Sequence, residues 1–172
     1  MKRLIIQTAV IRLVVVQVFF MTFTVQAFAG ENRATHYQTT HNVTLVKKAF
    51  DNWAKGTGGL FDLLDENMTW IITGNDPLSG IYTSKKELME KIIIPFGQKI
   101  AQSLKPAVRN IYGDGSTVIA LFDAQTTAND NKPYKNTYAW FLEMENDKIH
   151  KVTAVLDLAE FRNLWDRVAS AK

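Results

Sequence analysis

Two aspartates lie where the predicted strands could present a carboxylate to a substrate. Asp123 lies between Phe122 and Ala124 in an apolar run, and Asp157 closes the last predicted strand. Burial in a dry pocket raises the pKa of a carboxyl group and lets it act as a general acid or base. Each also has a plainer interpretation: Asp123 as an exposed strand residue, and Asp157 as the N-cap of a helix that begins at Leu158. Ordinary residue preferences favour the plainer interpretation, and the sequence leaves both alternatives open.

The other reactive residue types form no known catalytic or metal-binding pattern. The sequence has no cysteine, which excludes disulfides, thiolate metal ligands and cysteine nucleophiles. His36, His41 and His150 have no pair at a metal-binding spacing. No Gly-x-Ser-x-Gly motif occurs, and the glycine-rich residues 56–59 are not followed by the lysine of a phosphate-binding loop. We therefore expect neither a metal nor another cofactor.

Aromatic residues are the most informative candidates for binding. Tryptophan and tyrosine combine a large apolar surface with a polar N–H or O–H, which suits a ligand pocket as well as an ordinary core. Packing in the core or a dimer interface is an open alternative for each residue taken singly. The residues that we expect to line a ligand pocket are Trp53, Trp70, Tyr82, Phe122, Tyr138 and Phe141.

The N-terminal segment has the pattern of a secretory signal peptide. Basic residues at positions 2, 3 and 12 precede an uncharged run over residues 13–30, and small residues at positions 27 and 29 form a cleavage pattern. We predict cleavage after Ala29 and export to the periplasm or the exterior. An uncleaved membrane anchor is the alternative, and we expect contact with a membrane only through this segment.

The charge of the chain gives no support for nucleic-acid binding. The 172 residues carry 20 basic and 17 acidic side chains, and three of the basic ones lie in the signal segment. Subtracting those three leaves 17 basic and 17 acidic residues in residues 30–172, a net charge of zero. A neutral domain lacks the basic surface that nucleic acids require.

Helices come first in the predicted order of elements. Residues 30–41 are polar and aperiodic, which predicts a loose lead-in to one domain over residues 42–168. Apolar spacing predicts a helix from Asn42 to Gly56 and a short helix over residues 60–64. Ser84 and Glu87 have the spacing of a capping box and begin a third helix, which Pro95 should kink or divide.

Strands follow the helices. They are predicted over residues 68–73, 107–112, 117–127, 134–145 and 148–156, before a last helix over residues 158–168. Tight turns are expected at residues 113–115 and 146–147. This order predicts an α+β fold in which helices cover one face of an antiparallel sheet.

Several of these residues are similar in type and order to those of a known superfamily. They are Trp70, the turn from Pro77 to Gly80, the pattern Tyr134-x-Asn136-x-Tyr138, Lys148-Ile149 and Asp157. Over residues 42–168 the chain resembles the SnoaL-like branch of the nuclear transport factor 2-like superfamily, which also includes ketosteroid isomerases and limonene epoxide hydrolases. The resemblance implies a curved sheet wrapped by helices into a cone with an internal apolar pocket, and a homodimer formed through the outer sheet face.

The resemblance also assigns positions on the strand that contains Tyr138. It places Thr137, Ala139 and Phe141 on the pocket face, so Tyr138 and Trp140 would face the opposite surface.

The catalytic positions of these enzymes are vacant in this sequence. Alignment with ketosteroid isomerases places Ile72 at the base, Ala139 at the oxyanion acid, and residue 49 or 50 at the oxyanion tyrosine. The Arg-x-Asp pair of the epoxide hydrolases is absent from the middle strand, and Thr153-Ala154 replaces the Arg-Asp of the last strand. The acidic acid/base residue of the SnoaL-like cyclases has only Asp123 or Asp157 as a candidate.

Three functional hypotheses follow. The first is an exported domain that binds a small hydrophobic molecule in an apolar pocket, without the catalytic residues of either enzyme. The second is a lyase, isomerase or hydrolase that uses Asp123 or Asp157 as acid/base. The third is a dimeric structural or protein-interaction module.

Overall fold

The computed structural model describes residues 33–169. The chain divides into two compact units, Met1–Gln38 and Thr39–Lys172. The contacts discussed below lie within the second unit. The predicted signal peptide, residues 1–29, lies outside the described residues. Within the described part, no helix is both long enough and apolar enough to cross a membrane.

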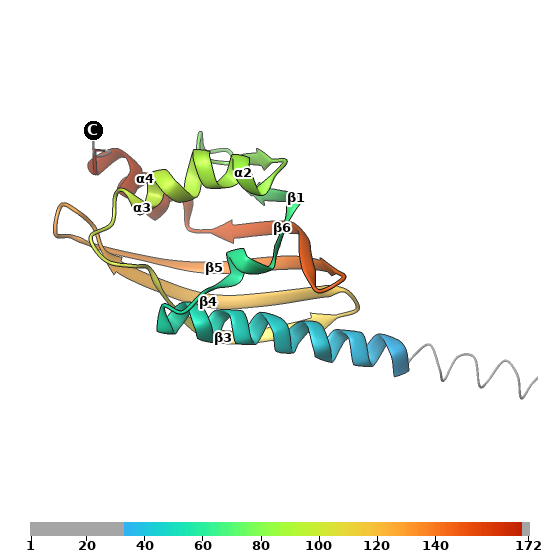
Figure 1. The fold of residues 1–172 in the computed structure, drawn as a ribbon. Helices are drawn as coiled ribbons and strands as arrows, with labels where there is room; N and C mark the ends of the chain where they lie inside the picture. Colours follow the sequence, from blue (N-terminus) through green and yellow to red (C-terminus); the bar gives the residue numbers. More distant parts are fainter. Residues whose placement is uncertain (1–32, 170–172) are drawn as a thin grey trace, which may run out of the picture. The chain divides into compact units, whose positions relative to one another are not determined.

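Six strands form one curved sheet in the order β2-β1-β6-β5-β4-β3 (Figure 1). Neighbouring strands are antiparallel except β1 and β6, which run parallel. The predicted α+β fold is confirmed, with one parallel pair inside the antiparallel sheet. The strands are β1 Leu64–Ile72, β2 Gly80–Tyr82, β3 Lys105–Asp114, β4 Thr117–Thr127, β5 Pro133–Glu145 and β6 Lys148–Leu156.

Two tight turns fix the register of the hairpins. Gly115 has a φ of 56° between β3 and β4, and Asn146 and Asp147 have φ angles of 49° and 62° between β5 and β6. Glycine adopts this left-handed conformation freely, and asparagine and aspartate adopt it more readily than other residues. The turn at residues 146–147 lies where the sequence predicts it. The turn predicted at residues 113–115 begins at Gly115, because β3 continues to Asp114.

The predicted third helix consists of three short segments. These are α2 Lys85–Leu88, the π-helical turn η2 Met89–Ile93, and α3 Ile94–Gly97. The Ser84 hydroxyl accepts a hydrogen bond from the backbone N–H of Glu87, which confirms the predicted N-cap. Pro95 lacks an N–H and its ring crowds the preceding turn, so the π turn just before it accommodates the lost hydrogen bond. The irregularity predicted near Pro95 is therefore present, but it lies in the π turn before the proline, and α3 continues through Pro95 itself.

Two further helical segments flank the strands. The helix α4 Leu158–Arg167 begins at Asp157, whose carboxylate accepts hydrogen bonds from the backbone N–H groups of Ala159 and Glu160. The predicted N-cap role of Asp157 is therefore confirmed. A single 3-10 turn, η1 Leu60–Leu63, takes the place of the helix predicted over residues 60–64.

The first described helix begins earlier than predicted. It covers residues 33–55, so the prediction of a loose lead-in is wrong for residues 33–41. From Thr39 onward, within the second unit, polar contacts hold the helix against the hairpin turns. Thr39 donates a hydrogen bond to the Gly115 carbonyl at 3.1 Å, and His41 Nε2 lies 2.8 Å from Asp147 Oδ1. Hydrophobic periodicity cannot reveal a helix that is positioned by such contacts.

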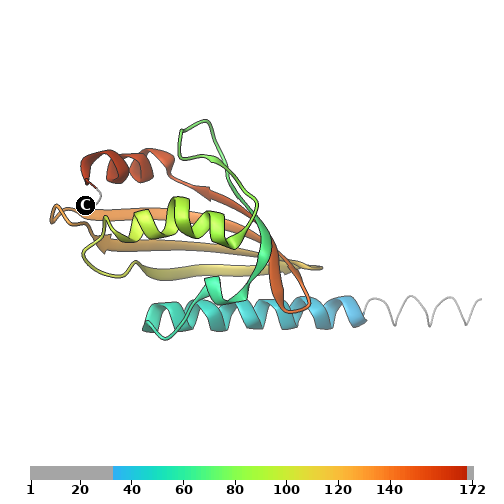
Figure 2. The ribbon, with the colours of Figure 1, turned by 45° about the horizontal axis from the view of Figure 1, so that its top comes forward.

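The core lies between one face of the sheet, here called the inner face, and the helices (Figure 2). Val118, Ala120 and Phe122 of β4 are buried on this face. From the helix that ends at residue 55, Val46 and Phe50 pack into the same core. The other face of the sheet, the outer face, has no helix over it among the described residues.

The structure corrects which side chains of β5 face the core. Tyr138 and Trp140 are buried on the inner face, and Phe141 lies on the outer face with 38% of its surface exposed. The alignment had placed them the other way round. Side-chain volume explains the difference, because Thr137 and Ala139 are too small to fill the space between the sheet and the helices.

Candidate functional site

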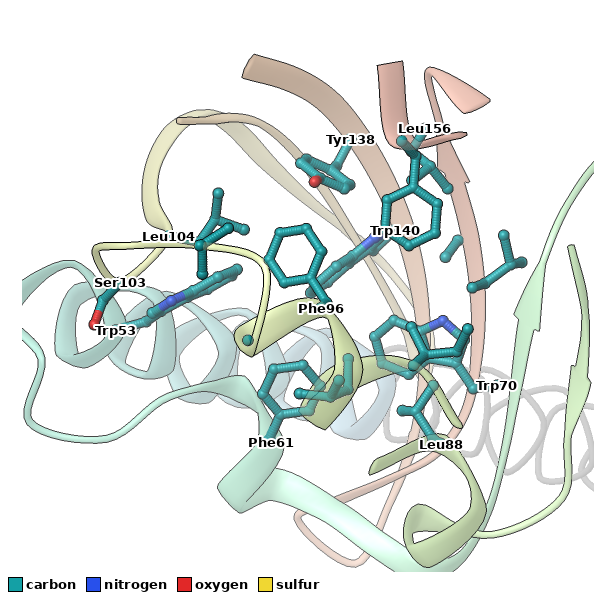
Figure 3. Close-up of a pocket in the computed structure, with 17 residues that line it drawn as sticks. Trp53, Phe61, Trp70, Leu88, Phe96, Ser103, Leu104, Tyr138, Trp140 and Leu156 are labelled. Atoms are coloured by element: carbon teal, nitrogen blue, oxygen red, sulfur yellow. The ribbon is translucent and has the colours of Figure 1, made fainter. Parts of the chain in front are cut away.

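A cavity of about 290 Å³ lies between the inner face of the sheet and the helices (Figure 3). Seventeen residues line it, from β1, β5 and β6 on one side and from the helical segments and the loop between α3 and β3 on the other. Their side chains are almost entirely apolar. This volume is near the lower end of the range of small-molecule sites in proteins.

Three tryptophans form an aromatic wall of this cavity. Trp53 comes from the first described helix, Trp70 from β1 and Trp140 from β5. The Trp53 and Trp140 rings stack, with centroids 6.1 Å apart and planes 13° from parallel, and Trp70 meets Trp140 edge-on at 5.0 Å. Phe61 of η1 stacks on Trp70 at 6.1 Å. These contacts fix the ring orientations before any ligand enters.

The helical segments supply the opposite wall. Leu88 of α2 and Ile92 of η2 are buried, and Ile93 and Phe96 are half-buried beside them. Leu88, Ile92 and Phe96 follow one another at intervals of four residues, which places them on one face of a helix. The N-cap at Ser84 therefore positions the start of the segment that closes the cavity.

No charged side chain is among the seventeen lining residues. Their polar groups are the Tyr138 and Ser103 hydroxyls and the indole N–H groups of the three tryptophans. A charged ligand would lose its hydration here without gaining an ionic partner. The cavity therefore suits an uncharged molecule.

A buried hydrogen-bond network stands behind Tyr138. The Tyr138 and Tyr134 hydroxyl oxygens lie 2.8 Å apart, and Asn136 Nδ2 donates a hydrogen bond to the Tyr134 hydroxyl at 3.0 Å. Burial raises the pKa of Tyr134 to about 12 and raises the pKa of Tyr138 well above its usual value. Both phenols are therefore uncharged at physiological pH.

Asp123 lies on the outer face and does not line the cavity. Its carboxylate accepts a hydrogen bond from the Thr137 hydroxyl at 2.6 Å and two from the Arg109 guanidinium at 2.7 Å. The hydrogen bond from Thr137, and then those from Arg109, lower the pKa of Asp123. Asp157 is likewise outside the cavity and is occupied as the N-cap of α4.

The structure brings only some of the predicted pocket residues together. Trp53, Trp70 and Tyr138 line the cavity, and Phe122 packs directly behind them. Tyr82 does not line it, and its hydroxyl donates to the Leu78 carbonyl at 3.4 Å. Phe141 points away on the outer face, so its assignment to the pocket is corrected.

Sequence analysis did not identify the residues of the helical wall. The spacing of Leu88, Ile92 and Phe96 after a clear N-cap is the signal that could have found them. Phe61 gave no comparable signal, because a single 3-10 turn has no periodicity to detect. Within residues 33–169, no group of three or more His, Cys, Asp or Glu side chains is arranged to hold a metal ion.

Comparison with solved structures identifies the fold. The chain is similar to a nuclear transport factor 2-like protein of unknown function from Burkholderia pseudomallei, with 17% identity, a TM-score of 0.60, and coverage of 72% of this chain and 95% of that one. It is similar to TerC, co-crystallised with polyporic acid, with 13% identity, a TM-score of 0.58, and coverage of 73% and 98%. It is also similar to a protein from Jannaschia sp. CCS1 provisionally assigned as a SnoaL-like polyketide cyclase, with 12% identity, a TM-score of 0.58, and coverage of 76% and 95%.

The chain therefore has the cone-shaped fold of the nuclear transport factor 2-like and SnoaL-like proteins. No protein-family model matches the sequence, and no curated protein matches it. The function must be argued from the site itself, because this fold carries several activities.

Proposed function

We propose that the protein binds a small, uncharged hydrophobic molecule in the cavity of the cone. The observation that carries this proposal is a cavity of about 290 Å³ with three tryptophans and no charged residue in its lining. Apolar cavities with a few polar groups are the usual form of small-molecule sites. The stacked rings also keep their arrangement through contacts with one another, so little ordering is needed when a ligand binds.

The site supports binding more strongly than catalysis. Both candidate carboxylates, Asp123 and Asp157, lie outside the cavity lining. Ile72, at the position where ketosteroid isomerases have their base, lines the cavity with an alkyl side chain that cannot accept a proton. Both carboxylates instead line a second, more polar hollow of about 610 Å³. There Asp123 is bound by Thr137 and Arg109, and Asp157 caps α4, so each carboxylate already has a structural role.

The comparisons suggest which compounds to test first. TerC was co-crystallised with polyporic acid, and the protein from Jannaschia is provisionally assigned as a polyketide cyclase. Aromatic polyketides therefore belong in the first panel, together with sterols and terpenes. Fatty acids serve as the charged comparison and should bind more weakly.

A thermal-shift screen tests the proposal. A ligand present at 100 times its Kd adds about 2.7 kcal/mol to the free energy of unfolding, which raises Tm by several degrees. Ile93→Trp places a large ring on a lining position, and Ile94→Trp places the same ring on the next residue, which is 50% exposed and outside the lining. We expect Ile93→Trp to lose the shift and Ile94→Trp to keep it. Equal shifts in both variants would mean that the ligand binds elsewhere.

A second copy of the chain is the partner that the outer face favours. A continuous row of cross-strand neighbours crosses all six strands on this face, and most of its side chains are apolar. The row consists of Ile81, Ile71, Thr153, Phe141, Ile119 and Tyr112. We propose that two such rows pack together in a homodimer, since a two-fold interface requires a surface that is complementary to itself.

Export is the third part of the proposal. The pattern over residues 1–29 supports secretion with cleavage after Ala29. N-terminal sequencing of the protein recovered from the periplasm of a bacterial host should start at Gly30. Recovery of the uncleaved chain in the membrane fraction would instead support an anchor.

A further inference from the structure

The orientation of the Asn136 side chain is fixed by the backbone of one residue. Its Oδ1 accepts a hydrogen bond from the Asp157 N–H at 2.9 Å, and its Nδ2 donates to the Asp157 carbonyl at 2.9 Å. Exchanging the oxygen and the nitrogen would place donor against donor and acceptor against acceptor. The second N–H of Nδ2 is therefore the group that meets the Tyr134 hydroxyl, 3.0 Å away.

This donor determines the direction of the next hydrogen bond. Tyr134 is completely buried, and its hydroxyl already accepts a hydrogen bond from Asn136. Its own proton needs an acceptor, because a buried unsatisfied hydroxyl costs about 1–3 kcal/mol. Among the hydrogen bonds of the described residues, the remaining partner of this hydroxyl is Tyr138, at 2.8 Å. Tyr134 therefore donates and the Tyr138 oxygen accepts.

In this network the Asn136 amide donates to Tyr134 and the Tyr134 hydroxyl donates to Tyr138. The hydroxyl proton of Tyr138 is therefore not used within the network. The Tyr138 side chain lines the cavity, and Figure 3 shows its hydroxyl oxygen at the tip of the ring. Phe122 stacks on the Tyr138 ring at 4.9 Å, and Trp140 meets it edge-on at 5.8 Å. The ring is held in place, so the position of its hydroxyl oxygen is set before a ligand arrives. The hydrogen bond that this oxygen accepts from Tyr134 leaves the Tyr138 proton as the one that can turn to a ligand.

We propose that the Tyr138 hydroxyl is a pre-positioned hydrogen-bond donor and that the ligand is an uncharged ring compound with a carbonyl oxygen that accepts this bond. The inference rests on the proposed binding function and adds the chemical class of the ligand. The tryptophan wall and the aliphatic helical wall contact the rings, and the carbonyl fixes how the molecule sits between them. A pure hydrocarbon would enter the same cavity but leave the Tyr138 proton without a partner.

The pH behaviour expected of this donor follows from its burial. Burial raises the pKa of Tyr138 well above its usual value, so the hydroxyl keeps its proton throughout the physiological range. The donor should therefore act equally well at pH 6 and pH 8.

A matched pair of probes tests the inference. Tetralin and 1-tetralone have the same fused-ring skeleton and differ only by a carbonyl in place of one methylene. Calorimetric titration gives Kd for both probes on wild-type protein, on Tyr138→Phe, and on Tyr82→Phe. Tyr82→Phe is the control, because this tyrosine is buried but does not line the cavity. We expect Tyr138→Phe to weaken 1-tetralone binding about two- to tenfold, the range of one hydrogen bond, and to leave tetralin binding unchanged. Tyr82→Phe should change neither.

The infrared C=O stretch of bound 1-tetralone is a second readout that needs no variant. A hydrogen bond from Tyr138 should lower its frequency relative to 1-tetralone in hexane. The inference is wrong if the frequency equals the hexane value, or if Tyr138→Phe binds 1-tetralone as tightly as wild type does. In either case, binding of tetralin to the wild-type protein would still support the proposed function. If neither probe binds the wild-type protein, both the inference and the proposed function are overturned.

Discussion

Phe122 and Tyr138 are direct neighbours across β4 and β5, and their rings stack with centroids 4.9 Å apart and planes 12° from parallel. Phe122 also meets Phe50 edge-on at 4.9 Å and Trp140 edge-on at 4.8 Å. It therefore connects the first described helix with the wall of the cavity, although it does not line the cavity itself. The geometry of the site depends on this residue behind it.

Replacing Phe122 should destabilise the whole domain. Its side chain is fully buried, so Phe122→Ala is expected to lower the free energy of unfolding by about 3–5 kcal/mol. Urea denaturation measures the change through the midpoint at constant m-value. Ile94→Ala is the control, because Ile94 is 50% exposed and should lose only about 1 kcal/mol or less. Similar losses in the two variants would contradict the central position of Phe122.

Asp123 should titrate below its ordinary value of 3.8, because Thr137 and Arg109 donate hydrogen bonds to its charged form. A carboxyl group with a lowered pKa stabilises the fold above the unfolded-state pKa. This contribution is lost as the pH falls through the lower folded-state value. Carboxyl-carbon NMR on wild type and Arg109→Ala should show a low pKa that rises in the variant. A wild-type pKa above 3.8 would contradict the outer-face network.

Asp123→Asn tests whether this carboxylate takes part in ligand binding. The carboxylate lies on the outer face, so the variant should keep the wild-type Kd for tetralin. Ala154→Leu serves as the opposite control, because it adds volume directly to the cavity lining and should weaken binding. A loss of tetralin affinity in Asp123→Asn would move the binding site to the outer face.

Glu87, in the segment that closes the cavity, should titrate with a pKa well below its ordinary value. Hydrogen bonds from Lys91, and then from the Thr83 backbone N–H, lower its pKa to about 2 from an ordinary value of 4.5. The stabilisation from Glu87 is therefore fully present above pH 4.5 and is lost as the pH falls through about 2. NMR titration of Lys91→Met should show the Glu87 pKa rising toward 4.5. An unchanged value would mean that Lys91 has no part in the shift.

Local signals predicted most of the elements. The N-caps at Ser84 and Asp157 and the left-handed turn residues at Gly115 and Asn146 act within a few residues of sequence, and each marks an observed boundary. The three-residue strand β2 has no such signal. It exists because it pairs with β1, and the parallel pairing of β1 with β6 joins segments far apart in the chain.

Residue type predicted which kinds of side chain line the cavity, but not which face of the sheet each side chain of β5 occupies. Trp53 and Trp70 were expected to line a pocket because of their chemistry, and both do. On β5, alternation separates Tyr138 and Trp140 from Phe141, but aromatic residues occur in both sets. The set that contains Phe141 also contains Lys135, Glu143 and Glu145, whereas the set that contains Tyr138 has no charged residue. Charge alternation along β5 therefore indicates the correct face, and the assignment from the resemblance was wrong.

The outer face gives the last prediction, which concerns the homodimer. Phe141 lies in the apolar row that crosses the sheet, paired with Ile119 on one side and Thr153 on the other. Phe141→Lys would place a charge against its own copy at a two-fold interface, and burying an unpaired charge is strongly unfavourable. We expect the mass from light scattering after size-exclusion chromatography to fall from that of a dimer to that of a monomer.

Gln125→Lys is the matched control, because it adds the same charge to the outer face of β4 at the sixth residue beyond Ile119. Six residues of strand span about 20 Å, so this variant should stay dimeric. If the wild-type protein is already a monomer at micromolar concentration, the proposed dimer is wrong. The apolar row would then be a candidate binding surface for a different protein. If both lysine variants dissociate, the interface extends beyond the row to the end of β4 that contains Gln125. If only Phe141→Lys dissociates, the contact between the two copies is centred on the row that joins β2 to β3.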